Sequence, residues 1–295
     1  MEKLATEFTS RGTILRGTLH MPDKAENPPV VVMAHGFGGC VSFGLAPFAE
    51  HFCAQGMAVL TFDYRGFGKS DGEPRNWVSP SRHLWDWKAA VAHARTLPQV
   101  DRSRVALWGT SFSGGHVLVT AADIPAVKCV VCQVPFVDGR TTLFLMPPRL
   151  LARSMSAAVR DLARMAMGKP ALYVPLVAAP GQLGALTQPG CVEEFMRLVP
   201  DEEKANANRV TARTFLEVPA YRPLARAQDV QCPVLVIMAE EDNLIPSRSV
   251  QQAAGLLPNA ELVSLPVSHF DVYFGKVFEK VVKKEAAFLK KHLKP

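Results

Sequence analysis

Residues 108–115 read WGTSFSGG and stand between a short apolar run and a helix-length segment. A strand, a tight turn and a helix in this order form the context of a nucleophile elbow, in which a serine sits on a strained turn. The positions two before and two after that serine must be small, which Gly109 and Ser113 satisfy around Ser111. A shifted register would make Ser113 the nucleophile, between Ser111 and Gly115. We favour Ser111, because Gly109 lies at the end of the strand, where the strained turn belongs.

Outward from this stretch, short apolar runs alternate with segments of helical length. Runs that are apolar on both faces and separated by helices indicate a parallel sheet covered on both sides, which is an α/β fold. A hairpin around Arg11 and Gly12, from Glu7 to Met21, precedes them. The expected strands are Val30 to Ala34, Ala58 to Phe62, Val105 to Trp108, Val127 to Val134, Val234 to Ala239 and Leu262 to Leu265. The expected helices are Phe43 to Gln55, Ser81 to Thr96, Gly114 to Ala122, Ser247 to Leu256 and a basic C-terminal helix.

Between Val137 and Gln228 the alternation stops, and no strand-like run is found. Apolar and arginine positions from Leu150 to Met165 predict an amphipathic helix, and Val192 to Leu198 predict another. We therefore expect residues 1–137 and 229–295 to form the core and residues 138–228 to form a helical cap. Five of the ten methionines fall in this insertion, which suits either ordinary packing or a deformable wall of an apolar pocket.

A glycine-rich turn, His35-Gly36-Phe37-Gly38-Gly39, ends the first expected parallel strand. An elbow serine needs two backbone N–H groups aimed at the developing oxyanion, one from the residue after the nucleophile and one from this turn. Phe112 and Phe37 are the candidates. A dinucleotide fingerprint is disfavoured because Val41 stands where its third glycine belongs, and Asp63 similarly replaces the first glycine of a P-loop.

A serine hydroxyl becomes a nucleophile when a histidine takes its proton and a carboxylate orients that histidine. His269 follows the last expected strand and is the best candidate base, since the other histidines fall on helices, in the oxyanion turn or at a hairpin end. Asp242 follows the strand Val234 to Ala239 and is the preferred acid, with Glu241 and Glu240 as alternatives. Asp271 and Asp138 are expected to be surface charges or helix caps.

These landmarks resemble the α/β-hydrolase fold serine hydrolases over nearly the whole chain. The resemblance is carried by AHGFGG at 34–39, FDYRGFGKSDGEPRN at 62–76, WGTSFSGG at 108–115, LVIMAEEDNLIP at 235–246 and SHFDVY at 268–273. SDGEPRN and WGxSFSG are similar to dienelactone-hydrolase-like and X-prolyl-peptidase-like esterases, and to polyketide transferases and hydrolases of biosynthetic clusters. The resemblance implies an eight-stranded, mostly parallel sheet, a cap after the sixth strand and a covalent acyl-enzyme. Ser113 in place of glycine departs from the usual pattern, as does GALTQPG at 184–190.

The function that we expect is hydrolysis of a carboxylic ester or thioester of a medium-sized apolar or aromatic acyl group. Peptidase action is disfavoured because no acidic pair suited to a free amino terminus stands out. The main alternative is an acyltransferase that passes the acyl group, such as a polyketide, to an acceptor other than water. Carbon–carbon bond chemistry and a ligand-binding protein without turnover are the remaining readings. Candidate substrate-binding residues are Gly36, Gly38, Phe136, Phe144 and Met146.

The composition is that of a compact globular protein: the 295 residues are 48% hydrophobic and 20% charged, with a net charge of +6. The last twenty residues hold seven lysines and two glutamates, so a solvated face of a terminal helix explains most of this charge. We expect no nucleic acid, membrane, metal or cofactor, and a small-molecule partner.

Six scattered cysteines and the lack of a signal peptide favour a reduced, cytoplasmic protein. Redox or zinc chemistry at Cys129 and Cys132 is disfavoured because no second ligand pair lies nearby. His83 and Asp86 are expected to form a surface pair. A homodimer is left open.

Overall fold

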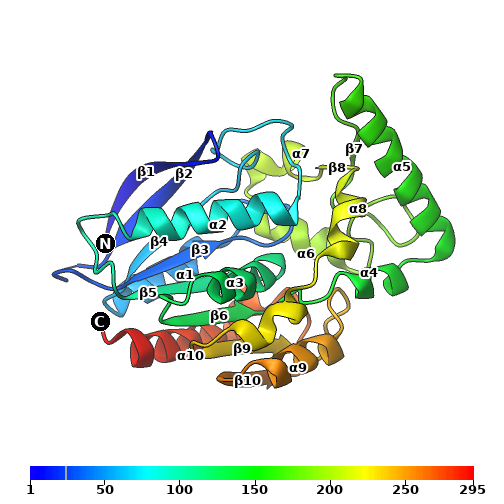
Figure 1. Ribbon diagram of the computed structural model, residues 1–295. Coiled ribbons are helices and arrows are strands. Elements are labelled where there is room, and N and C mark those ends of the chain that lie inside the picture. The colour runs from blue at the N-terminus through cyan, green and yellow to red at the C-terminus, as the bar shows by residue number, and fades with distance from the viewer. Residues whose placement is uncertain (24) are drawn as a thin grey trace.

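The computed structural model describes residues 1–23 and 25–295 and is built around an eight-stranded sheet (Figure 1). The strand order is β1-β2-β4-β3-β5-β6-β9-β10. β1 pairs with β2, and β2 with β4, in antiparallel fashion, and all other neighbours in this sheet are parallel. The strands are β1 (Glu2–Ser10), β2 (Thr13–Met21), β3 (Val30–Ala34), β4 (Ala58–Phe62), β5 (Val105–Thr110), β6 (Cys129–Gln133), β9 (Val234–Ala239) and β10 (Ala260–Leu265). The α/β fold and the mostly parallel eight-stranded sheet predicted from the sequence are confirmed.

Burial explains why the sequence pattern located the inner strands. Every residue of β3, β4, β5, β6 and β9 is buried, whereas the edge strand β10 alternates between exposed and partly buried positions before the buried Leu265. The N-terminal hairpin is longer than expected, since Glu2 already pairs with Met21. Its two turn residues, Arg11 and Gly12, both have positive φ angles, as a two-residue hairpin turn requires.

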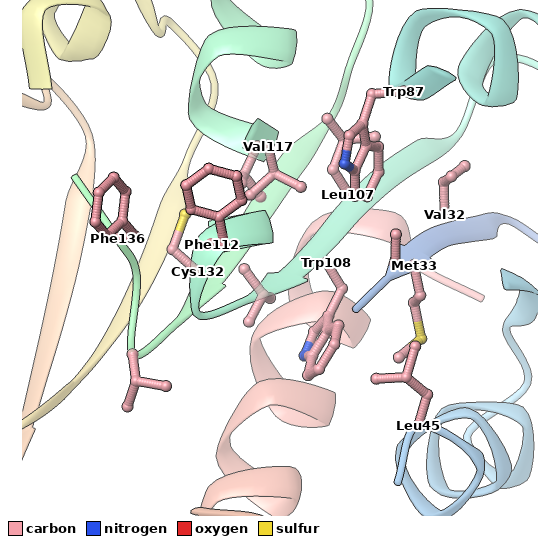
Figure 2. Packing of buried hydrophobic residues seen from close by; sticks show 14 of the residues in the cluster. Val32, Met33, Leu45, Trp87, Leu107, Trp108, Phe112, Val117, Cys132 and Phe136 are labelled. Carbon is pink, nitrogen blue, oxygen red and sulfur yellow. The ribbon is translucent and has the colours of Figure 1, made fainter. Parts of the chain in front are cut away.

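Helices cover both faces of the sheet (Figure 1). α1 (Ala46–Ala54) and α10 (Gly275–Leu293) lie on one face, and α2 (Pro80–Ala94), α3 (Phe112–Asp123) and α9 (Ser247–Leu256) lie on the other. Figure 2 shows how β5 divides its side chains between the layers, with Leu107 beside Trp87 and Trp108 on the opposite side. Trp108 reaches α10, where its indole N–H donates to Glu285 at 3.0 Å.

One expectation for α2 is wrong. His83 and Asp86 are not a surface pair, because α2 turns both side chains into the protein. Asp86 is fully buried and forms an ion pair with Arg65, whereas His83 stacks on Tyr64 with ring centroids 4.0 Å apart. A buried arginine partner, distant in sequence, allows a carboxylate to occupy this interior position.

The cap is the chain between β6 and β9 and lies at the end of the molecule away from both termini (Figure 1). Its helices are α4 (Arg140–Leu145), α5 (Pro148–Ala166), α6 (Cys191–Leu198), α7 (Lys204–Ala207) and α8 (Thr214–Glu217), with 3-10 turns at Asp201–Glu203, Val218–Ala220 and Pro223–Asp229. The predicted helices correspond to α5 and α6. The expected absence of strands is wrong, since β7 (Tyr173–Val174) and β8 (Val210–Thr211) form a small antiparallel ladder. Strands of two residues are too short to produce a recognisable sequence pattern.

Polar contacts hold the cap together and fix it to the core. Within the cap, Arg213 forms a buried ion pair with Asp161 of α5, with its Nε 2.7 Å from the carboxylate. Toward the core, Trp77 Nε1 donates to Glu217 of α8 at 2.6 Å, and Asn76 binds the Arg209 carbonyl. The segment that follows SDGEP is therefore the docking edge for the cap. No helix in the described part of the chain is long and apolar enough to cross a membrane.

Candidate active site

Ser111 occupies a strained turn between β5 and α3. Its φ of 56° and ψ of −121° lie outside the regions that non-glycine residues favour. Backbone hydrogen bonds hold it there. Ser111 N–H donates to the Gln133 carbonyl and Phe136 N–H to the Ser111 carbonyl, each at 2.8 Å, and Gly114 N–H donates to the Ser111 carbonyl at 2.9 Å. A Cβ at Gly109 would lie 2.3 Å from the Ser113 carbonyl oxygen, so only glycine fits there. Ser111 therefore lies on a strained strand-turn-helix junction and is the candidate nucleophile.

Ser113 is not placed to act as a nucleophile. It is fully buried, and its hydroxyl is 2.9 Å from the Tyr64 hydroxyl, which also accepts a hydrogen bond from Trp87 Nε1 at 2.8 Å. Ser111, by contrast, lines the cavity described below. The structure thus gives Ser111 and Ser113 different surroundings, where the sequence left two registers open.

Three side chains from three strand ends meet at the elbow. His269 Nε2 is 3.0 Å from Ser111 Oγ, and His269 Nδ1 is 2.6 Å from Asp242 Oδ2. Because a carboxylate only accepts, Nδ1 carries the imidazole proton and Nε2 is free to accept the serine hydrogen. The other Asp242 oxygen accepts the N–H groups of Leu244 and Ile245, so the acid is held from both sides. A histidine that contacts both a serine hydroxyl and a carboxylate is the arrangement that can activate a serine.

The alternative acids are not part of these contacts. Glu240 accepts a hydrogen bond from Ser264 on the edge strand, and Glu241 is exposed. Asp138, expected to be a surface charge or helix cap, forms an ion pair with Arg222. Asp271 accepts both the backbone N–H and the hydroxyl of Ser268, which fixes the turn that carries the histidine. Asp271 therefore stabilises the turn before the 3-10 helix Asp271–Tyr273, whose start has no side-chain cap.

The glycine-rich turn lies directly against the nucleophile. A Cβ at Gly36 would lie 2.8 Å from Ser111 Cβ, so the backbone approaches as closely as glycine permits. The rings of Phe37 and Phe112 contact each other edge to face, with centroids 5.4 Å apart. Neither backbone N–H has a hydrogen-bond acceptor among the described residues, and Phe112 begins α3, where the helix dipole favours negative charge. The two predicted oxyanion donors thus come from adjacent segments and remain free to bind an anion.

His35 fixes this turn. Its Nε2 is 2.6 Å from the Phe43 carbonyl and therefore carries the proton, while Nδ1 accepts the Gly36 N–H at 2.7 Å. Burial lowers the pKa of His35 to about 4, so the ring is neutral at physiological pH. A charged ring would carry a proton on Nδ1 and could not accept from Gly36. His35 therefore stabilises the glycine-rich turn. The sequence identifies this histidine only as the first residue of that turn.

A cavity opens above Ser111 between the core and the cap. Of the predicted substrate-binding residues, Gly36, Phe136 and Met146 line it, together with Ser111, Phe37 and Phe112. Phe144 does not, since its side chain is 87% exposed, and Leu143 lines the cavity from the same helix instead. Gly38 lies one position beyond the lining, where a Cβ would lie 2.0 Å from a Leu176 methyl group of the cap.

Several lining residues escaped the sequence reading. Phe195 and Leu198 belong to α6. The spacing of the apolar residues predicts this helix but does not show which face of it points into the cavity. Leu244 and Ile245 lie two and three residues after Asp242 and could have been inferred from that proximity. Gln188 precedes α6 in the segment that departs from the family pattern.

The six cysteines are all free thiols. Cys129 and Cys132 are buried on β6 and are not joined in a disulfide, and burial raises the pKa of both thiols. Among the described residues, no group of three or more histidine, cysteine and carboxylate side chains could hold a metal ion.

Comparison with known proteins shows what the whole chain is similar to. The chain is 37% identical to the quorum-quenching protein AidA of Acinetobacter baumannii over 288 residues, which cover 98% of this chain and 94% of that protein. It is 28% identical to the polyketide transferase af380 of Aspergillus fumigatus, covering 99% of both chains, and 29% identical to the thiohydrolase apmlB of Arthrinium phaeospermum, covering 96% and 95%. The crystal structure of the α/β hydrolase GrgF from a Penicillium species superposes with a TM-score of 0.84 at 26% identity over the full length of both chains.

Residues 25–265, most of the chain, match the family described as serine aminopeptidase, S33. This range includes the elbow, the glycine-rich turn, the cap and the acid. The chain therefore belongs to this family of α/β hydrolases.

Proposed function

We propose that the protein hydrolyses acyl esters or thioesters through a covalent acyl-serine. Ser111 Oγ attacks the carbonyl carbon as its proton passes to His269 Nε2, and the N–H groups of Phe37 and Phe112 bind the resulting oxyanion. Collapse of this intermediate breaks the bond to the alcohol or thiol, which leaves with the proton held by His269. Water then attacks the acyl-serine by the same route, which releases the acid and restores the serine. The contacts of His269 with Ser111 and Asp242 are the observation that carries this proposal.

The cavity favours an uncharged, apolar acyl group. Its walls are mostly aliphatic and aromatic, with Leu151 and Met155 contributed by α5 and Phe215 by α8. No carboxylate side chain lines it in the described part of the chain, so the amino terminus of a peptide would find no counter-ion there. Despite the family's description, the substrate that fits is therefore an ester or thioester of an apolar or aromatic acid rather than a peptide.

A fluorophosphonate tests the nucleophile, because it reacts quickly only with an activated serine beside an oxyanion hole. Intact-mass spectrometry of wild type, Ser111→Ala and Ser113→Ala should show one adduct on wild type and on Ser113→Ala, and none on Ser111→Ala. Ser113→Ala is the matched control, two residues away. An adduct retained by Ser111→Ala, or no adduct on wild type, would refute the assignment.

Acyl transfer is a second candidate on the same site, favoured by the apolar walls and by the relative named a polyketide transferase. Adding an alcohol or amine acceptor during turnover and quantifying the products by mass spectrometry separates the two outcomes. A product that joins acyl group and acceptor, in excess of the free acid, would identify a transferase. Since another relative is named a quorum-quenching protein, loss of signal in a quorum-sensing reporter strain belongs in the same screen.

A further inference from the structure

The cavity contains few polar side chains, and most of them already have partners. Thr142 donates to the Gly139 carbonyl at 2.6 Å, and Thr214 donates to the Val78 carbonyl at 3.1 Å. Tyr273 bonds the Thr110 hydroxyl, and both ring nitrogens of His35 are occupied, as described above. Apart from Ser111 and His269, these groups have little left to offer a ligand.

Gln188 is the exception. Its Oε1 accepts the Thr187 N–H at 3.0 Å, and because the partner is a donor, this contact fixes which end of the amide is the oxygen. The Nε2 group therefore retains two N–H donors, for which no acceptor is found among the described residues. Gln188 lines the cavity, whose other lining residues are mainly apolar, and is partly buried. An unpaired donor in such a wall favours a ligand that supplies an acceptor.

The backbone around Gln188 is held by both the cap and the core. Its carbonyl accepts the Cys191 N–H at the start of α6, and the next carbonyl, that of Pro189, accepts Asn243 Nδ2 at 3.0 Å. Asn243 directly follows Asp242 in the chain. The backbone of Gln188 is therefore anchored on the side of the cavity formed by α6 and the acid loop, and the Thr187 N–H holds the side-chain oxygen. A donor held in place discriminates better than a mobile one.

We propose that Gln188 is a specificity-determining residue that donates a hydrogen bond to a carbonyl or hydroxyl oxygen on the acyl chain. This inference rests on the proposed function and narrows its substrate class to apolar acyl chains that carry an uncharged oxygen acceptor beyond the scissile carbonyl. A plain hydrocarbon chain would leave the amide hydrogens unpaired, and such sites select against the analogue that lacks the polar group.

The test compares a straight-chain acyl p-nitrophenyl ester with analogues in which a ketone replaces one methylene at successive positions beyond the β carbon. For each ester, kcat/KM is measured with wild type, Gln188→Met and Gln182→Met. Methionine keeps the side-chain length and removes the donors. Gln182 is an exposed glutamine of the same cap segment and serves as the matched control.

At one ketone position, the ratio of ketone to plain ester should fall about fivefold in Gln188→Met, as expected for one lost hydrogen bond. The ratio should stay unchanged in Gln182→Met. A ratio that is equal in wild type and Gln188→Met at every position, or one that falls equally in Gln182→Met, would overturn the proposal. Fluorophosphonate labelling separates failure of this inference from failure of the proposed function. If wild type is labelled but the ketone-to-plain-ester ratio is the same in wild type and Gln188→Met, only the role of Gln188 is overturned. If wild type is not labelled, both proposals are overturned.

Discussion

Replacing the buried Glu285 with glutamine should change how the stability of the protein depends on pH. Glu285 lies on α10 and is fully buried. Trp108 Nε1 donates to its Oε2, while Oε1 has no hydrogen-bond partner among the described residues. Desolvation of the carboxylate raises the pKa of Glu285 from 4.5 to about 8. The carboxyl group is therefore protonated in the folded protein at neutral pH and ionised in the unfolded chain.

The sign follows from proton binding. Between pH 4.5 and about 8 the folded state holds one proton more than the unfolded state at this site, so the free energy of unfolding falls as pH rises. The stability that the raised pKa provides is fully present below pH 4.5 and is lost as pH rises through about 8. A difference of about 3.5 units at about 1.4 kcal/mol per unit gives a loss of about 5 kcal/mol across this range.

Glu285→Gln cannot ionise, and its amide oxygen can still accept from Trp108. Its new NH2 group has no acceptor and imposes a constant cost of about 1–3 kcal/mol, so the informative quantity is the slope and not the value at one pH. Urea denaturation of wild type, Glu285→Gln and the exposed control Glu279→Gln, at several pH values from 5 to 8.5, measures that slope. We expect the variant to gain about 4 kcal/mol relative to wild type between pH 5 and 8. Parallel curves for wild type and Glu285→Gln would show that Glu285 is ionised in the fold and would refute the reasoning.

Three further predictions concern the site and the cap. Asp242→Asn should lower kcat for an activated ester by about 10³- to 10⁴-fold with little change in KM, because the imidazole loses the carboxylate that orients it; a loss below tenfold would contradict the relay. Gly36→Ala should slow fluorophosphonate labelling of Ser111 by about 100-fold, since its Cβ would lie 2.8 Å from Ser111 Cβ. Urea denaturation should show whether the fold is retained. An unchanged labelling rate would show that the glycine-rich turn can move away from Ser111 without loss of function. Asp161→Asn should destabilise the protein by about 3–5 kcal/mol in urea denaturation, because a buried guanidinium loses its counter-ion; a change below about 1 kcal/mol would mean that water reaches the pair.

The features that could be predicted from sequence are those with a local pattern. β5 and α3 were found because an apolar run, a small-residue turn and a helix follow one another directly, and the inner strands because both faces are buried. Asp242 and His269 could be chosen because parallel strands bring their carboxyl ends to one edge, so position along the chain implied proximity.

Features that depend on a distant partner could not be predicted. Asp86 and Asp161 look like surface charges on their helices, and only the arginines that reach them from remote segments make their burial tolerable. Phe144 was placed in the pocket because it is aromatic, but whether a residue of a short helix faces the cavity depends on how the cap docks. That docking is set by contacts such as Trp77 with Glu217, which join parts of the chain far apart in sequence.

Ser113, the residue that departs from the family's elbow pattern, shows that the two small positions of the motif meet different constraints. A Cβ at Gly109 would lie 2.3 Å from a backbone carbonyl that cannot move without unwinding the start of α3, so this position admits no side chain. The side chain at position 113 lies instead beside Tyr64, where its hydroxyl gains a buried hydrogen bond. The bond ties the first turn of α3 to the segment after β4, and it also gives the Tyr64 hydroxyl its second partner beside Trp87. Serine at this position is therefore compatible with the elbow because the Tyr64 hydroxyl is within hydrogen-bond distance of its side chain, and a glycine there would leave Tyr64 with one partner fewer.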